Sequence, residues 1–269
     1  MNKANRERNL AIIQEMTLMD DVFTTVFFDG HPECIEEVLD MIFTFKVEVL
    51  EVKTQADFQN IHGCSVIFDI IAQDAEKRLF DIEIQRANKG ADVKRARYYS
   101  SLLDTRAIEQ GEDFGKIKDT YVIIITENDV LKGREPIYNI DRKIIQTDKY
   151  FDDGEHIIYI NTSYRGDGST KIEKPIKCFT SKAAQDIPAD KLRERFTDIK
   201  TGKAEKEEYK MCELLEKIVQ KERAEGNAEG HADVAENMLR TGNFTGESIA
   251  QLCSLTVKQV HQIKNSISQ

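Results

Sequence analysis

Two carboxylates on neighbouring candidate strands form a pattern that could hold a divalent cation. Asp69 interrupts the apolar run 66–71, and Glu83 alternates with apolar residues in a run that also holds Asp81 and Gln85. Because successive strand side chains point to opposite faces, Asp81, Glu83 and Gln85 are predicted to share one face. An ionised carboxylate in an apolar strand is costly unless it is paired or binds a metal. The pattern therefore indicates a function for Asp69 and Glu83.

The segment 74–78 predicts a hairpin that brings the two acids together. If the loop is centred on Glu76, Asp69 and Glu83 lie directly opposite each other, with Cβ atoms roughly 4.5–5.5 Å apart. Two like charges at that separation repel, and a bound divalent cation would remove the repulsion. A slip of one residue would instead place Asp69 opposite Ile82. The hypothesis therefore depends on the register of this hairpin.

An acid on one strand followed by Glu-x-(basic or amide) on the next resembles the motif of the PD-(D/E)XK nucleases. Here the motif reads Asp69 … Glu83-Ile84-Gln85. Further segments resemble one branch, the PD-(D/E)XK nuclease family transposases, also called recombination-promoting nucleases. This resemblance covers roughly residues 10–160 and includes Leu18–Phe28, Lys94–Ser100 and Tyr121–Ile125.

The resemblance implies a metal-dependent DNA endonuclease that acts in DNA recombination or mobile-element biology. Asp69, Glu83 and the Ile84 carbonyl would then hold Mg²⁺ or Mn²⁺, since oxygen ligands suit both ions. Gln85 takes the place of the lysine in the archetypal motif. Its amide can donate a hydrogen bond but carries no charge, so activity is expected to be slower rather than absent.

Acidic and basic residues outside the hairpin complete the expected site. The resemblance implies that an acid of the first helix, either Asp20 or Asp21, contacts the metal or its water. The segment 86–118 holds eight Lys or Arg against five acids, although the whole chain has a net charge of −10. A solvated helix would also explain such a segment. Within it we expect contacts with DNA phosphates, or with Glu83, from Lys94, Arg95 and Arg97.

Three alternatives remain open from the sequence, one for the acids and two for the function of the chain. Asp69 and Glu83 could form salt bridges to Arg95 or Arg97 in a purely structural network, and Asp81 is expected to face solvent or to support the ligands. At the level of function, the chain could be a weakly active or inactive DNA-binding protein of the same fold. It could also be a scaffold that forms homo-oligomers through a charged helix at 205–229.

Composition sets the class of protein. The chain has 269 residues, of which 40% are hydrophobic and 32% charged, so it can bury a core. It contains no apolar run of the roughly 18–20 residues that a membrane helix needs, and its polar beginning does not resemble a signal peptide. The five cysteines are scattered without the spacing of a zinc site or a disulfide framework. We therefore expect a cytoplasmic protein without a membrane partner.

The hydrophobic pattern predicts an α/β (α+β) fold, which agrees with the restriction-endonuclease-like mixed sheet that the resemblance implies. A nuclease-like domain is expected over 1–180, and a helical C-terminal region over 181–269 with a long charged helix and a possible helix-turn-helix. Helices are expected at 9–19, 20–28, 33–43, 92–110 and 183–200, and strands at 45–52, 66–72, 79–85, 120–126, 137–145 and 156–161.

Overall fold

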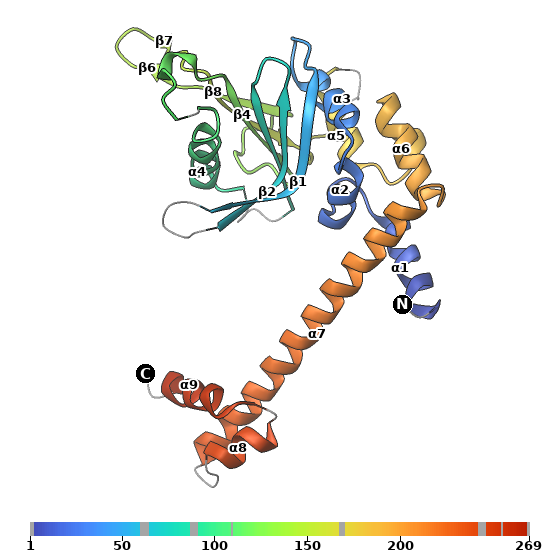
Figure 1. Ribbon diagram of the computed structural model, residues 1–269, viewed down its shortest axis with the longest axis vertical. Coiled ribbons are helices and arrows are strands. Elements are labelled where there is room, and N and C mark those ends of the chain that lie inside the picture. Colours follow the sequence, from blue (N-terminus) through green and yellow to red (C-terminus); the bar gives the residue numbers. More distant parts are fainter. Residues whose placement is uncertain are drawn as a thin grey trace. The chain divides into compact units, whose positions relative to one another are not determined.

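A six-stranded mixed sheet forms the centre of the first part of the chain (Figure 1). The computed structural model describes residues 3–59, 65–86, 91–108, 110–166, 170–241, 246–253 and 255–267. The strand order is β1-β2-β3-β4-β8-β5, with β6 and β7 forming a separate two-stranded hairpin. The strands are β1 Val49–Gln59, β2 Ser65–Asp74, β3 Leu79–Gln85, β4 Thr120–Thr126, β5 Ile137–Ile140, β6 Lys143–Ile144, β7 Lys149–Tyr150 and β8 Glu155–Asn161.

The sheet changes from antiparallel to parallel at β3. Strands β1, β2 and β3 form an antiparallel meander, whereas β4 pairs in parallel with both β3 and β8. Every residue of β4 is buried, as expected for an apolar strand with both faces covered. The predicted central position of this strand is therefore confirmed.

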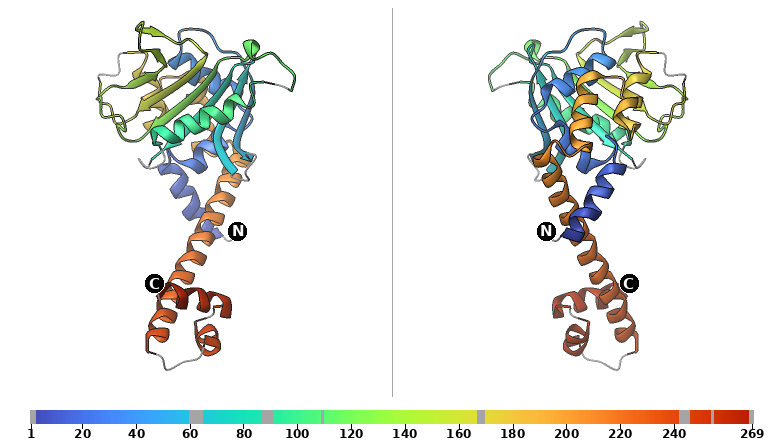
Figure 2. Two further views of the ribbon diagram at one scale, coloured as in Figure 1. Left: turned by 90° about the vertical axis from the view of Figure 1, so that its left-hand side faces the viewer. Right: turned by 90° about the vertical axis from the view of Figure 1, so that its right-hand side faces the viewer.

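Helices cover both faces of the sheet (Figures 1 and 2). Helix α4, Val93–Asp104, packs Ala96, Tyr99 and Leu103 against one face. The opposite face is covered by α2 Asp21–Phe28, α3 Pro32–Ile42, α5 Glu173–Thr180 and α6 Asp190–Lys200. This two-sided covering makes the first unit a mixed α/β fold, as the pattern predicts.

Lys200 lies in the last turn of α6 and binds the C-terminal end of α1 (Lys3–Glu15). Its Nζ donates to the carbonyls of Ile13, Gln14 and Met16 at 2.6–2.7 Å. A cation is favoured at a helix C-terminus because the last carbonyls lack partners in the helix. We expect Lys200→Met to lower the free energy of unfolding by about 2–3 kcal/mol, measured by urea titration. A change no larger than that of exposed Lys174→Met would contradict this role.

Several element ends differ from the sequence prediction. Helix α4 ends at Asp104 rather than near 110, and residue 105 caps it with its N–H bonded to the Leu103 carbonyl. The expected strand at 137–145 is divided into β5 and β6, and only β5 joins the main sheet. Strand β1 begins at Val49, later than the predicted 45. The strand differences arise because strand pairing depends on neighbours that lie far away in the sequence, whereas α4 ends at a local cap that the spacing of its apolar residues does not reveal.

The chain divides into two compact units, Met1–Cys212 and Glu213–Gln269. The division falls later than the expected 180/181 boundary because Phe196 of α6 packs with Phe23 and Phe27 in the first unit. Helix α7 runs from Glu205 to Thr241, longer than the expected 205–229. None of the helices in the described ranges is both long and apolar enough to span a membrane.

The second unit contains a small helical cluster. Helices α8, Gly246–Leu252, and α9, Val257–Ile267, are separated by four residues, which is the spacing of a helix-turn-helix. Ala235 of α7 packs with Ile249 and Val260 in an apolar core. The expected pair of short helices is therefore present, while DNA reading by it stays a prediction.

Candidate active site

The β2–β3 hairpin has the register on which the metal-site hypothesis depends. Gln73 pairs with Leu79 and Ile70 with Ile82, so the loop is centred on Glu76. Within the turn, the Asp74 carboxylate accepts hydrogen bonds from the backbone N–H groups of Glu76 and Arg78 at 3.0 and 2.8 Å. Such side-chain bonds to nearby amides stabilise a turn and fix its register.

The next pair in this register, Asp69 and Glu83, exchanges side-chain hydrogen bonds across the two strands. The Asp69 N–H donates to Glu83 Oε1 at 3.0 Å, and the Ile84 N–H donates to Asp69 Oδ2 at 2.9 Å. The backbone pairing of β2 with β3 ends at Ile70 and Ile82. Just beyond this pair, each carboxylate accepts a hydrogen bond from a backbone amide of the opposite strand. Both predicted ligands, and the backbone of Ile84, are brought together at one point.

The acid Asp81 lies on the same face as Glu83 but is fully buried, with an exposed fraction of 0%. Its pairing opposite Ile71 on β2 and Val122 on β4 places it under α4, among the apolar side chains of that core. The expectation that it faces solvent is therefore wrong. Both of its carboxyl oxygens lack a hydrogen-bond partner among the described residues.

Burial and neighbouring negative charges raise the pKa values of all three carboxyl groups. Burial, followed by the charge of Asp69, raises the pKa of Glu83 to about 8. Burial raises the pKa of Asp69, with a smaller contribution from the charge of Asp21. Burial and then the charge of Glu83 raise the pKa of Asp81 well above its ordinary value. Ionisation of these acids is therefore unfavourable unless a positive charge compensates it.

Two polar side chains contact Glu83 directly. The Gln85 amide donates to Glu83 Oε2 at 3.3 Å, and an Arg95 guanidinium nitrogen lies 3.6 Å from the same oxygen. The Arg95 guanidinium also lies over the Tyr99 ring, 4.9 Å from its centre. By contrast, Lys94 and Arg97 are exposed on the outer side of α4. Arg95 and Arg97 thus occupy different environments, in agreement with their spacing on the helix.

This difference gives a matched pair of substitutions. Arg95→Met removes the cation beside buried Glu83, so we expect the free energy of unfolding above the Glu83 pKa of about 8 to fall by about 1–2 kcal/mol. Arg97→Met on the exposed side should change it by less than about 0.5 kcal/mol. Urea unfolding in metal-free buffer at about pH 9 compares the two. Equal losses would exclude a particular role for Arg95 at Glu83.

The two acids at the start of α2 have different partners. Asp20 accepts hydrogen bonds from the Thr17 N–H at 2.8 Å and from Arg86, so its carboxylate is already bound. Asp21 reaches the surface, and its charge raises the pKa of Asp69. Its own carboxyl group is half-buried, and this burial and then the charge of Asp20 raise the pKa of Asp21. Of the two residues left open by the sequence, Asp21 is the one coupled electrostatically to the hairpin.

A comparison with protein families identifies the chain. The model of the PD-(D/E)XK nuclease family transposases matches residues 19–225, which include α2, the hairpin, α4 and β4. The chain belongs to this family. Searches of curated proteins and of solved structures found no match. The mixed sheet flanked by helices is consistent with the restriction-endonuclease-like fold of PD-(D/E)XK proteins, which confirms the expected fold class.

PD-(D/E)XK nucleases generally use divalent metal ions. In this family member, two carboxylates supply part of the ligand set that such an ion needs. The facing carboxylates of Asp69 and Glu83 are hard oxygen donors, which Mg²⁺ and Mn²⁺ prefer. Among the residues described, no group of three or more His, Cys, Asp or Glu is arranged to hold a metal ion. A two-carboxylate site completed by water and substrate phosphate is nevertheless the usual form for Mg²⁺.

Long-range partners of this PD-(D/E)XK site were not visible in the sequence. Arg86 follows the motif directly, but its ion pairs to Asp20 and Glu127 join segments that are distant along the chain. A hydrogen bond from Gln55 on β1 lowers the pKa of Asp69, yet no motif marks that residue. Alternation correctly placed Asp81 on the face of Glu83 but could not show that α4 covers it.

Proposed function

We propose that this chain is a divalent-metal-dependent DNA endonuclease that acts in DNA recombination or mobile-element biology. The observation that carries the proposal is the reciprocal pair of hydrogen bonds that fixes Asp69 and Glu83 opposite each other. Membership of a nuclease-type family and the raised pKa values of both acids support it. A cation between the two carboxylates would offset their repulsion.

In this proposal Asp69 and Glu83 bind Mg²⁺ or Mn²⁺, with the Ile84 carbonyl as a third ligand. The bound ion would make a water more acidic and stabilise negative charge at the scissile phosphate. The surrounding residues orient this pair: the Gln85 amide and Arg95 both hold the Glu83 carboxylate from one side. Asp21 contributes further negative charge toward the ion, whereas Asp20 binds Arg86.

DNA is the partner that the proposed endonuclease activity implies. Lys94 and Arg97 lie exposed on α4 next to the hairpin and are proposed to contact its phosphates, while Arg95 is shared between Glu83 and the substrate. A homo-oligomer formed through α7 stays a prediction. So does a cytoplasmic location.

The test is cleavage of supercoiled plasmid DNA by purified protein in Mg²⁺, Mn²⁺ or EDTA. We expect nicked and linear products with metal only, and none from an Asp69→Ala variant with an unchanged circular dichroism spectrum. Equal products from both proteins would indicate a contaminating nuclease. An inert wild type that binds DNA in a salt-sensitive manner would favour the alternative of a DNA-binding protein without useful catalysis.

A further inference from the structure

A basic cavity lies on the α4 side of the sheet, at the other end of β3 from the candidate active site. It has a volume of about 480 Å³ and lies between the β2–β3 turn and the segment that follows α4. Its lining includes one acid, Glu112, and four cations: Lys77, Arg106, Lys116 and Lys118.

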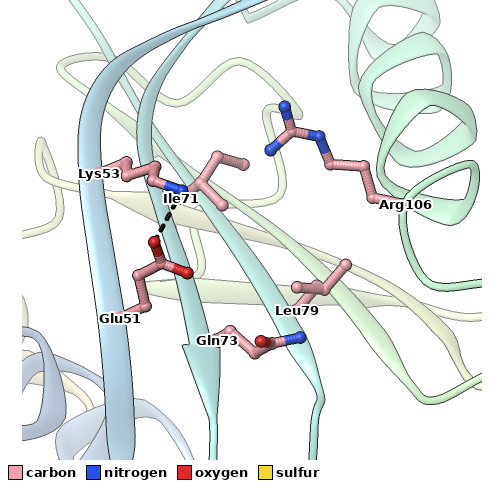
Figure 3. A pocket seen from close by; sticks show the side chains of 6 residues that line it. All are labelled: Glu51, Lys53, Ile71, Gln73, Leu79 and Arg106. Carbon is pink, nitrogen blue, oxygen red and sulfur yellow. Dashed lines mark ion pairs between the residues drawn. The ribbon is translucent and has the colours of Figure 1, made fainter.

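A second hollow of about 240 Å³ adjoins this cavity and shares Gln73 and Arg106 with it. Figure 3 shows the Arg106 side chain extending from the end of α4 toward the β-strands, while Glu51 and Lys53 lie on β1. The Lys53 ammonium pairs with Glu51 at 2.6 Å, so these two charges balance each other. The charge of Glu51 also acts on Arg106, so the excess positive charge of the larger cavity comes from its three lysines.

The excess of positive charge around this cavity contrasts with the whole chain, which is acidic and has 48 Asp and Glu against 38 Lys and Arg. Within the described part of the chain, no ion pair joins Lys77, Lys116 or Lys118 to a carboxylate. All three lysines are exposed. Four cations and a single acid among the described lining residues create a local positive potential that favours an anion.

The outer side of α4 connects the cavity with the candidate active site. The exposed residues of α4 and of its C-cap include no acid: Val93, Lys94, Arg97, Tyr98, Ser101 and Thr105. The acids at the two ends of this helix already accept hydrogen bonds. Asp92 caps the N-terminus of the helix, and Asp104 accepts a hydrogen bond from Thr120. A helix of 12 residues is about 18 Å long, which corresponds to roughly five steps along one DNA strand.

We propose that this basic cavity binds a backbone phosphate of the DNA, several nucleotides away from the phosphate at Asp69 and Glu83. The inference rests on the proposed nuclease function and adds a second anchoring point to it. Lys77, Lys116 and Lys118 contact the phosphate, and Arg106 forms the wall toward the sheet. The outer side of α4 then follows the backbone between the two points.

The test compares two triple variants with equal change of net charge. The cavity variant carries Lys77→Glu, Lys116→Glu and Lys118→Glu. The control carries Lys149→Glu, Lys174→Glu and Lys177→Glu at exposed lysines on the β6–β7 hairpin and on α5, which covers the other face of the sheet. Fluorescence anisotropy with a labelled duplex in EDTA measures binding without cleavage, over a series of salt concentrations.

We expect the cavity variant to bind DNA at least about tenfold more weakly than the control. Its plot of log affinity against log salt should be shallower by about 1, because the loss of the contact with one phosphate removes about 0.9 from the slope. Wild-type cleavage and binding with equal affinity and slope for both variants would overturn the inference and leave the proposed function intact. A wild type that neither binds nor cleaves DNA would overturn both.

A free phosphate compound could use the same chemistry, so inorganic pyrophosphate is titrated in parallel by calorimetry. The DNA assignment is supported if the cavity variant loses DNA affinity as described, whether or not it also loses pyrophosphate. It is overturned if the cavity variant loses pyrophosphate binding but keeps the DNA affinity and slope of the control.

Discussion

Glu83→Gln is expected to reduce metal-dependent cleavage of plasmid DNA by at least about 10³-fold. Glutamine keeps the size of the side chain and can still accept the Asp69 N–H through its carbonyl oxygen, so the hairpin should remain folded. It removes the negative charge that would bind the cation, and the chemistry supplied by the ion is lost with it. Initial rates of nicking with saturating Mn²⁺ measure the effect.

Asp81→Asn is the matched control for this experiment. Asp81 lies two residues before Glu83 on the same face of β3, and burial similarly raises the pKa of its carboxyl group. Because its side chain is completely covered, we expect Asp81→Asn to retain cleavage within about tenfold. Equal loss of activity in both variants would mean that the cleavage assay reports disruption of β3 rather than removal of a metal ligand.

The second large effect concerns stability in the absence of metal. The pKa of Glu83 is about 8 in the folded protein, above the ordinary glutamate value of 4.5. The folded state therefore binds an additional proton between these pH values, and its stability falls as the pH rises from about 4.5 to about 8. Glu83→Gln has no such proton to lose. In EDTA at about pH 9 we expect it to exceed the wild type by on the order of 3 kcal/mol.

Divalent metal should reduce the difference in stability between the two proteins. A ligand that binds only the folded state stabilises it, so Mn²⁺ should raise the melting temperature of the wild type at about pH 9 but not that of Glu83→Gln. Below about pH 5 the difference in EDTA should vanish, because Glu83 is then neutral in the folded state. The exposed Glu76→Gln serves as a control and should follow the wild type in every buffer. A Glu83→Gln variant that is less stable at high pH would contradict the raised pKa.

The hairpin was predictable because its determinants are local. Alternation of apolar and polar residues decides which face each side chain of β3 occupies, and the loop around Glu76 fixes the register with Asp69. The central position of β4 followed from its uninterrupted apolar sequence. In each case the structure depends on residues that are close in sequence, or on a regular alternation of apolar and polar residues along one strand.

The boundary between the two units was harder to predict from the sequence. The composition changes near residue 180, which suggested a boundary there, but α6 returns to pack Phe196 against α2. Such packing depends on the fit of two surfaces that the sequence does not place together. The end of α4 differed for a local reason, because a cap at residue 105 closes its last turn before the glycine at 111 is reached.

The sequence by itself determined that Asp69 and Glu83 face each other, since strand alternation and turn length are properties of a short segment. Only the tertiary structure decided that Asp20 binds Arg86 and that Asp21 acts on Asp69. It also decided that α4 covers Asp81 and that a basic cavity forms at the other end of β3. These contacts join segments separated by many residues, and the packing of helices on the sheet fixes them.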